Sequence, residues 1–146
     1  MNEEFRAGIN KKRILTFSKG KLLVQKELCS AQDDLNEAKD RMNNKKYKYV
    51  TITAYYSMFH SALALLYSKG YREKSHYYLL VALNALFVNA GLLEEKTIKD
   101  FRDAMVLREE ADYHGEFSQE GALSCLESAD KFLFYAKKIL NDSKKT

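Results

Sequence analysis

Residues 47–67 read YKYVTITAYYSMFHSALALLY, and this segment is the most informative one for how the chain folds. Between Lys48 and Lys69 the chain has no Asp, Glu, Lys or Arg, although hydroxyl side chains and the imidazole of His60 recur along it. An uncharged helix of this kind is typical of the centre of a bundle, where neighbours contact it on nearly all sides. Its polar groups then need partners inside the protein or at a subunit interface.

The segments around this stretch have apolar residues at spacings of three and four, the period of an amphipathic helix. We predict helices over about residues 21–44, 46–69, 75–90, 94–113 and 119–141. Gly70 fits a helix stop, and Ser75 and Ser118 fit N-caps. The predicted fold is all-α, an antiparallel bundle of four long helices plus a short N-terminal helix or arm. We expect a basic arm or short helix over 1–20, the bundle over 21–142 and a disordered tail over 143–146.

The composition fits one domain with a real core, since the chain has 146 residues. There is no proline and there are only 6 glycines, which favours long helices. The net charge of +4 permits an acidic partner such as RNA without demanding one. The two cysteines, Cys29 and Cys125, are isolated, which favours a reducing compartment over a disulfide framework. With no apolar signal region at the N-terminus, we expect a cytoplasmic protein.

Two runs, residues 48–69 and 77–93, are nearly long enough to span a bilayer. A membrane hairpin is therefore an alternative to the bundle. The hydroxyls, amides and His60 spread through both runs argue against it, because such groups are costly in lipid. We expect no membrane contact.

The candidate site lies at the end of the helix predicted over 94–113, where LREEADYHG occupies residues 107–115. Arg108 is a fixed cation whose planar fork suits phosphate, and His114 titrates near neutrality. The two groups suffice for metal-free RNA cleavage, in which the imidazole moves protons and the guanidinium stabilises the charged phosphorane. On a regular helix they lie about 120° apart, so they meet only if the helix ends early or two chains pair. The alternative is an ordinary salt bridge between Arg108 and Asp112.

The other histidines give less specific patterns. His60 fits a hydrogen-bonded core position better than a catalytic one. His76 begins a predicted helix, where backbone N–H groups together with Lys74 can hold a phosphate, although ordinary capping explains the same residues. The basic N-terminal arm can lie along phosphates or be a solvated tail.

Several chemistries are excluded by what the sequence lacks. The three histidines and two cysteines have no metal-ligand spacing, and there is no glycine-rich phosphate loop. We therefore predict neither a metal nor a cofactor. The tyrosine pairs at 55–56 and 77–78 can stack on bases, but at helical spacing such pairs are more often core and interface aromatics.

Taken together, these segments resemble the HEPN family, the higher eukaryotes and prokaryotes nucleotide-binding domain. The resemblance covers about residues 33–136 and is closest to the small bacterial and archaeal branch often encoded beside a nucleotidyltransferase. It rests on DLNEAKDRM at 34–42, YKYVTITAYYSMFHSALALLYSKG at 47–70, KSH at 74–76, LREEADYH at 107–114 and SADKFLFYAKKIL at 128–140.

The resemblance implies an α-helical homodimer joined through the face that bears an R-x4-6-H motif. Active members are metal-independent ribonucleases, often toxins of toxin–antitoxin or phage-defence modules, and a minimal nucleotidyltransferase commonly neutralises them. Arg108 and His114 fit the motif with five intervening residues, where the common form has four. Glu109 stands where Asn is frequent, and Glu116 where the nucleotidyltransferase-paired toxins typically have Tyr.

The resemblance thus implies a ribonuclease in which Arg108 binds phosphate, His114 does acid–base work and Asp112 or Glu109 orients them. The candidate substrate-binding residues are Tyr113, Lys74, His76 and His60. The alternative is a non-catalytic HEPN binding partner of a nucleotidyltransferase. In that case the Arg108 region maintains a subunit interface, and Tyr113 is an acceptor for modification.

Overall fold

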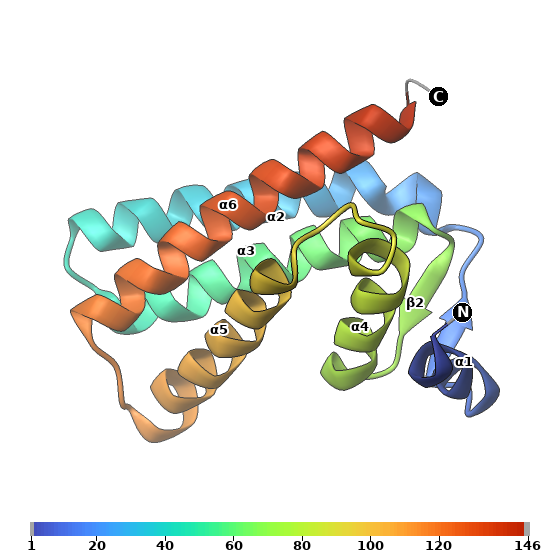
Figure 1. Ribbon diagram of the computed structural model, residues 1–146. Coiled ribbons are helices and arrows are strands. Elements are labelled where there is room, and N and C mark those ends of the chain that lie inside the picture. Colours follow the sequence, from blue (N-terminus) through green and yellow to red (C-terminus); the bar gives the residue numbers. More distant parts are fainter. Residues whose placement is uncertain (1, 145–146) are drawn as a thin grey trace.

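The computed structural model describes residues 2–144 and is built almost entirely of helices (Figure 1). In chain order the elements are α1 (Glu3–Asn10), β1 (Ile14–Thr16), α2 (Gly20–Asn43), α3 (Tyr47–Ser68), β2 (Tyr71–Glu73), α4 (His76–Leu83), the π-helical segment η1 (Asn84–Val88), α5 (Glu95–His114) and α6 (Gln119–Lys144). Helices α2, α3 and α6 lie alongside one another, and α4 and α5 cover a further side of α3 (Figure 1). The all-α prediction is confirmed.

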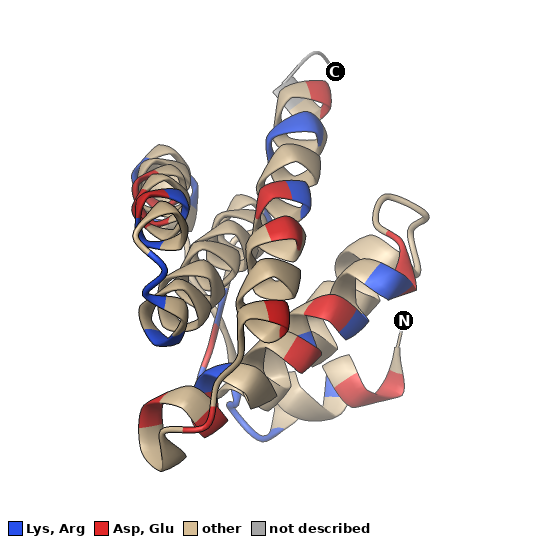
Figure 2. Ribbon diagram, turned by 90° about the vertical axis from the view of Figure 1, so that its left-hand side faces the viewer, with Lys and Arg blue, Asp and Glu red and all other residues tan. Residues whose placement is uncertain are grey.

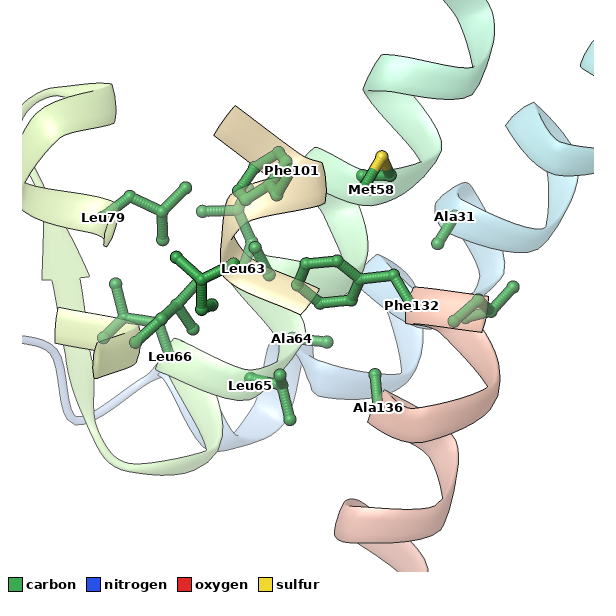
Figure 3. Packing of buried hydrophobic residues seen from close by; sticks show 14 of the residues in the cluster. Ala31, Met58, Leu63, Ala64, Leu65, Leu66, Leu79, Phe101, Phe132 and Ala136 are labelled. Atoms are coloured by element: carbon green, nitrogen blue, oxygen red, sulfur yellow. The ribbon is translucent and has the colours of Figure 1, made fainter. Parts of the chain in front are cut away.

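Helix α3 is the centre of the bundle, as its lack of charge predicted. Met58 and Ala62 of α3 are fully buried, and so are Phe132 and Ala136 of α6. Figure 3 shows Phe132 lying among residues of α3, with Ala31 of α2 close by. The small alanine side chains let the helices approach closely, while the large rings fill the space between them.

The hydroxyl groups of α3 find acceptors inside the bundle. Ser57 Oγ donates to the backbone oxygen of Ala31 at 2.7 Å, which ties α3 to α2. Ser61 Oγ donates to the backbone oxygen of Ser57 at 3.0 Å. Buried hydroxyls are costly without such partners, so these bonds explain how a helix this polar remains central. Within residues 2–144, no helix has both the length and the apolar character needed to cross a membrane.

The predicted caps form at the helix ends. Gly70 and Gly115 take positive φ angles of +80° and +65°, a conformation that costs other residues strain. Ser75 Oγ accepts from the backbone N–H of Tyr78 at 3.3 Å and so begins α4. Each of these residues fixes where a chain segment turns toward the next helix.

The N-terminal segment contains more structure than the sequence predicted. Residues 14–16 pair antiparallel with 71–73, so that Ile14 lies opposite Glu73. The Phe5 ring of α1 packs edge-on against Tyr71 at 5.3 Å. We predicted a short helix or arm here and no strand, because three residues are too few for a strand period to be recognised. The pair of strands β1 and β2 holds in place the segment that leads into α4.

Two further boundaries differ from the prediction. The helix predicted over 75–90 is α-helical only to Leu83 and continues as the π-helical η1. We expected a tail from residue 143, but α6 continues to Lys144, and residues 145–146 lie outside the described part.

Charges avoid the centre and gather on the outer helices. Figure 2 shows both signs along α2 and α6, with a largely uncharged α3 between them. The lysines of the α2–α3 turn, Lys45 and Lys46, are exposed. The C-terminal end of α5 is acidic, with Glu109 and Asp112 both exposed there.

Candidate functional site

Arg108 is the centre of the candidate site. It projects from α5 toward α3, and Nη2 donates to the phenol oxygen of Tyr56 at 2.7 Å. The same Nη2 lies 3.4 Å from Oδ2 of Asp112, the ion pair that the spacing of four predicted. The guanidinium carbon lies 5.3–5.6 Å from the ring centroids of Tyr55, Tyr56 and Tyr113. Three aromatic rings and a carboxylate thus hold one cation in place.

Burial does not neutralise this cation. Only 14% of the Arg108 side chain is exposed, and Nε has no hydrogen-bond partner among residues 2–144. Burial alone would lower the pKa of Arg108, but Tyr56, Tyr113, Asp112 and Tyr55 together leave its pKa raised. The guanidinium therefore stays charged and nearly immobile, which are the properties needed to hold a phosphate oxygen.

Tyr55 connects Arg108 to a histidine on another helix. Its ring lies beside the guanidinium, while its phenol oxygen lies 3.1 Å from Nδ1 of His76. Burial raises the pKa of Tyr55, so the phenol keeps its proton. Burial and the nearby charge of Arg108 lower the pKa of His76, while Glu109 opposes that shift. At neutral pH the imidazole is therefore uncharged.

His114 is the last residue of α5, and Gly115 ends the helix in the left-handed conformation. Because the helix stays regular to this point, His114 and Arg108 lie about 120° apart around its axis. In the described part of the chain no hydrogen bond or ion pair joins them, and His114 is exposed. One chain alone therefore does not bring the two predicted catalytic residues together.

The remaining predicted residues divide into two groups. Tyr113 lies over Arg108 and is 67% exposed, and Lys74 is exposed just before α4. His60 instead faces α2, where Nδ1 lies 2.6 Å from Oε2 of Glu27 and Nε2 lies 3.7 Å from Oδ2 of Asp34. Both nitrogens of His60 face carboxylates, so it joins two helices.

The partners that sequence reasoning missed are Tyr55 and Tyr56. They lie about fifty residues from Arg108 along the chain, so no local spacing indicates the contact. The available signal was chemical: a tyrosine in an uncharged, buried helix needs a partner for its phenol. Arg108, which continues a predicted apolar stripe, is one residue that can be the hydrogen-bond partner of such a phenol.

One arrangement that the described residues do not show is a cluster of metal-binding side chains. Among residues 2–144, no group of three or more His, Cys, Asp or Glu side chains is placed to hold a metal ion. The chemistry available at Arg108 thus comes from guanidinium, phenol, carboxylate and imidazole groups.

Tyr55, Tyr56, Tyr113 and Asp112 surround Arg108 near the end of α5, an arrangement that we call the Arg108 cage. Comparison with known proteins identifies the family of this all-α bundle. The model of the HEPN domain matches residues 24–144, and the chain belongs to this family. The family assignment made from the sequence is confirmed.

The relatives span most of the chain. A protein of Methanocaldococcus jannaschii named "Putative toxin" is 34% identical over 120 residues, covering 82% of this chain and 90% of its own. A "UPF0332 protein" of Archaeoglobus fulgidus is 32% identical over 123 residues, covering 83% and 98%. A second "Putative toxin" of Methanocaldococcus jannaschii is 28% identical over 119 residues, covering 80% and 81%. The chain is thus similar over most of its length to proteins that include two named "Putative toxin".

Proposed function

We propose that this protein is a metal-independent HEPN endoribonuclease that acts as a homodimer, as the toxin of a toxin–antitoxin or phage-defence module. The observation that carries the proposal is the caged Arg108, a charged guanidinium held by Tyr56 and Asp112 at one end of α5. A preorganised cation of this kind stabilises the charge that develops on phosphorus. The names of two relatives support a toxin.

In the proposed reaction the 2′-oxygen of RNA attacks the adjacent phosphorus, and the bond to the 5′-oxygen breaks. Arg108 binds the phosphate, His114 moves a proton, and Asp112 or Glu109 orients them. Because α5 stays helical to His114, which places it about 120° around the axis from Arg108, we assign the His114 of each site to the second chain. Exposed Val106 and Phe117, 54% and 53% accessible, offer apolar surface for this pairing.

The RNA would lie along the exposed residues around Arg108. The Tyr113 ring is accessible for stacking on a base, and Lys74 supplies positive charge near the start of α4. His76 lies at the helix start, where backbone N–H groups favour phosphate. His60, which we expected to join this group, is engaged by Glu27 and Asp34, and we assign it a structural role.

The first test is growth after induced expression, together with cleavage of RNA by the purified chain. We expect Arg108→Ala and His114→Ala to abolish toxicity and to reduce cleavage by about 10²–10³-fold. Arg102→Ala, an exposed arginine on the same helix, is the matched control and should cleave like wild type. Harmless wild-type protein that cuts no RNA would rule out the nuclease.

The second test asks whether the site is shared between chains. Neither Arg108→Ala nor His114→Ala protein should cleave appreciably alone, but a mixed dimer would have one composite site with both groups intact. After subunit exchange, about a quarter of wild-type activity should therefore return. No recovery in a mixture shown to contain mixed dimers would place both residues of a site in one chain.

The second candidate function is a non-catalytic binding partner of a nucleotidyltransferase. It is favoured by the exposed Tyr113, whose phenol is accessible for nucleotidyl transfer while its ring lies against Arg108. In this case the Arg108 cage maintains an interface. Mass spectrometry after co-expression with the nucleotidyltransferase, if one is encoded nearby, would find nucleotide on Tyr113 and none on the Tyr113→Phe variant.

A further inference from the structure

One side chain, that of Tyr55, contacts both His76 and Arg108. The Arg108 guanidinium carbon is 5.6 Å from the centroid of the Tyr55 ring, and the Tyr55 phenol oxygen is 3.1 Å from Nδ1 of His76. The Phe59 ring packs against His76 with centroids 5.4 Å apart. Three helices thus contribute to this arrangement: α3 provides the floor, α5 the cation and α4 the imidazole.

We propose that His76 is a second proton-transfer residue of this site, so that each chain places an imidazole beside its own Arg108. The proposal rests on the nuclease function proposed above and assigns His76 a chemical role beyond phosphate contact. His76 would accept the proton of the attacking 2′-hydroxyl, and His114 of the second chain would give a proton to the leaving 5′-oxygen. The products are a 2′,3′-cyclic phosphate and a 5′-hydroxyl, and the protons balance.

Helix capping does not account for the contacts of His76. The cap of α4 is made by Ser75, whose Oγ accepts from the N–H of Tyr78. The imidazole is not used in that cap and instead makes its hydrogen bond to Tyr55. It remains exposed on its outer side, where a substrate can reach it.

The surroundings suit a base. Tyr55 and Phe59 of α3 and Arg108 and Glu109 of α5 are the groups that face His76. Burial and Arg108 favour the neutral ring, which has a lone pair to accept a proton. The Tyr55 phenol oxygen lies 3.1 Å from Nδ1 and 3.4 Å from Nε2 of His76. The role requires the tautomer in which the nearer nitrogen, Nδ1, carries the hydrogen and donates to the phenol, so that Nε2 keeps its lone pair for the 2′-hydroxyl.

The test compares cleavage of a short RNA by wild type, His76→Ala and His76→Gln. We expect each variant to lose about 10²–10³-fold in kcat, and the acidic limb of the wild-type pH profile to disappear. Added imidazole should restore part of the activity of His76→Ala. Tyr77→Phe, an exposed neighbour on the same helix, is the control and should keep wild-type activity. Circular dichroism identifies any variant that fails to fold. If His76→Ala fails to fold, the cleavage rate of His76→Gln decides the test.

Mixed dimers separate this proposal from a merely structural role. Arg108→Ala mixed with His76→Ala should recover nothing, because both residues belong to the same chain's site. His114→Ala mixed with His76→Ala should recover about a quarter of wild-type activity. If the wild type cleaves RNA and His76→Ala cleaves it at a rate within about threefold of wild type, the role of His76 is overturned and the nuclease proposal stands. A wild type that cleaves nothing would overturn the nuclease itself, and the role of His76 with it.

Discussion

Two histidines lie against the same phenylalanine of α3, but their hydrogen-bond partners differ. The rings of His60 and His76 have centroids 5.8 and 5.4 Å from that of Phe59. Both nitrogens of His60 face carboxylates of α2, Glu27 and Asp34. The imidazole of His76 instead contacts a phenol and lies near a guanidinium.

The difference shows how surroundings select between structural and chemical roles. Carboxylates on both sides leave His60 no nitrogen for a substrate, so it serves to join α2 and α3. A phenol contacts His76, while burial and the charge of Arg108 lower its pKa, so the ring is uncharged and still accessible. The same residue type thus joins two helices in one place, and in the other it has the surroundings that the proposed proton transfer requires.

The largest effect should come from Arg108→Lys. A lysine keeps the charge but lacks the planar fork that bonds Tyr56 and lies among the tyrosine rings. We expect cleavage to fall by about 10²–10³-fold, nearly as far as for the alanine variant. Steady-state kinetics on a short RNA measures it. Wild-type activity in the lysine variant would mean that charge alone suffices.

A smaller effect, on stability alone, is expected on the His60 side. Glu27→Ala removes the carboxylate that holds Nδ1 of His60 and should cost about 1–3 kcal/mol of unfolding free energy. Glu27→Gln keeps a hydrogen-bond acceptor and should cost less. Urea denaturation measures both changes. Cleavage per folded molecule should change by less than tenfold, and a larger loss would mean that His60 takes part in the reaction.

Next in size is Tyr56→Phe, which removes only the hydroxyl that Arg108 donates to. The ring remains beside the guanidinium, but one charge-assisted bond is lost. We expect a roughly tenfold fall in cleavage. The matched variant Tyr47→Phe, on the first turn of the same helix, should show no fall. Equal activity in the two variants would show that the hydroxyl does not position Arg108.

The smallest effect concerns pH. Because the folded pKa of His76 is lowered, the unfolded chain binds a proton there more readily than the folded chain does. Wild-type stability should therefore decline as pH falls from about 6.5 toward the folded pKa. His76→Gln should decline less over the same window. Denaturation curves at several pH values measure the difference, and parallel declines would contradict a shifted His76.

The helices were predictable because each boundary has a local chemical cause. Gly70 ends α3 with a positive φ angle, and Ser75 begins α4 with its side-chain oxygen. The strand pair and η1 were not predictable. The strands are only three residues long and pair with partners distant in the sequence, while η1 departs from regular helix without a marker such as proline.

The contacts of the site that lie within one helix could be predicted from the sequence, whereas those between helices could not. The Arg108–Asp112 pair follows from a spacing of four on one helix, and it forms. The contacts of Arg108 with Tyr56, and of Tyr55 with His76, join separate helices. They depend on how α4 and α5 pack onto α3, which periodicity within a single segment does not specify.

The pairing of β1 with β2 affects which residues a shortened version of this protein should include. The match to the HEPN domain begins at residue 24, after β1 has ended. Yet the backbone oxygen of Arg13 accepts from the N–H of Lys74, just before His76. A polypeptide trimmed to the matched region would keep every candidate catalytic group and lose the strand that steadies the entry to α4. The limits of the family match are therefore a poor guide to the shortest fragment that keeps α4 in place.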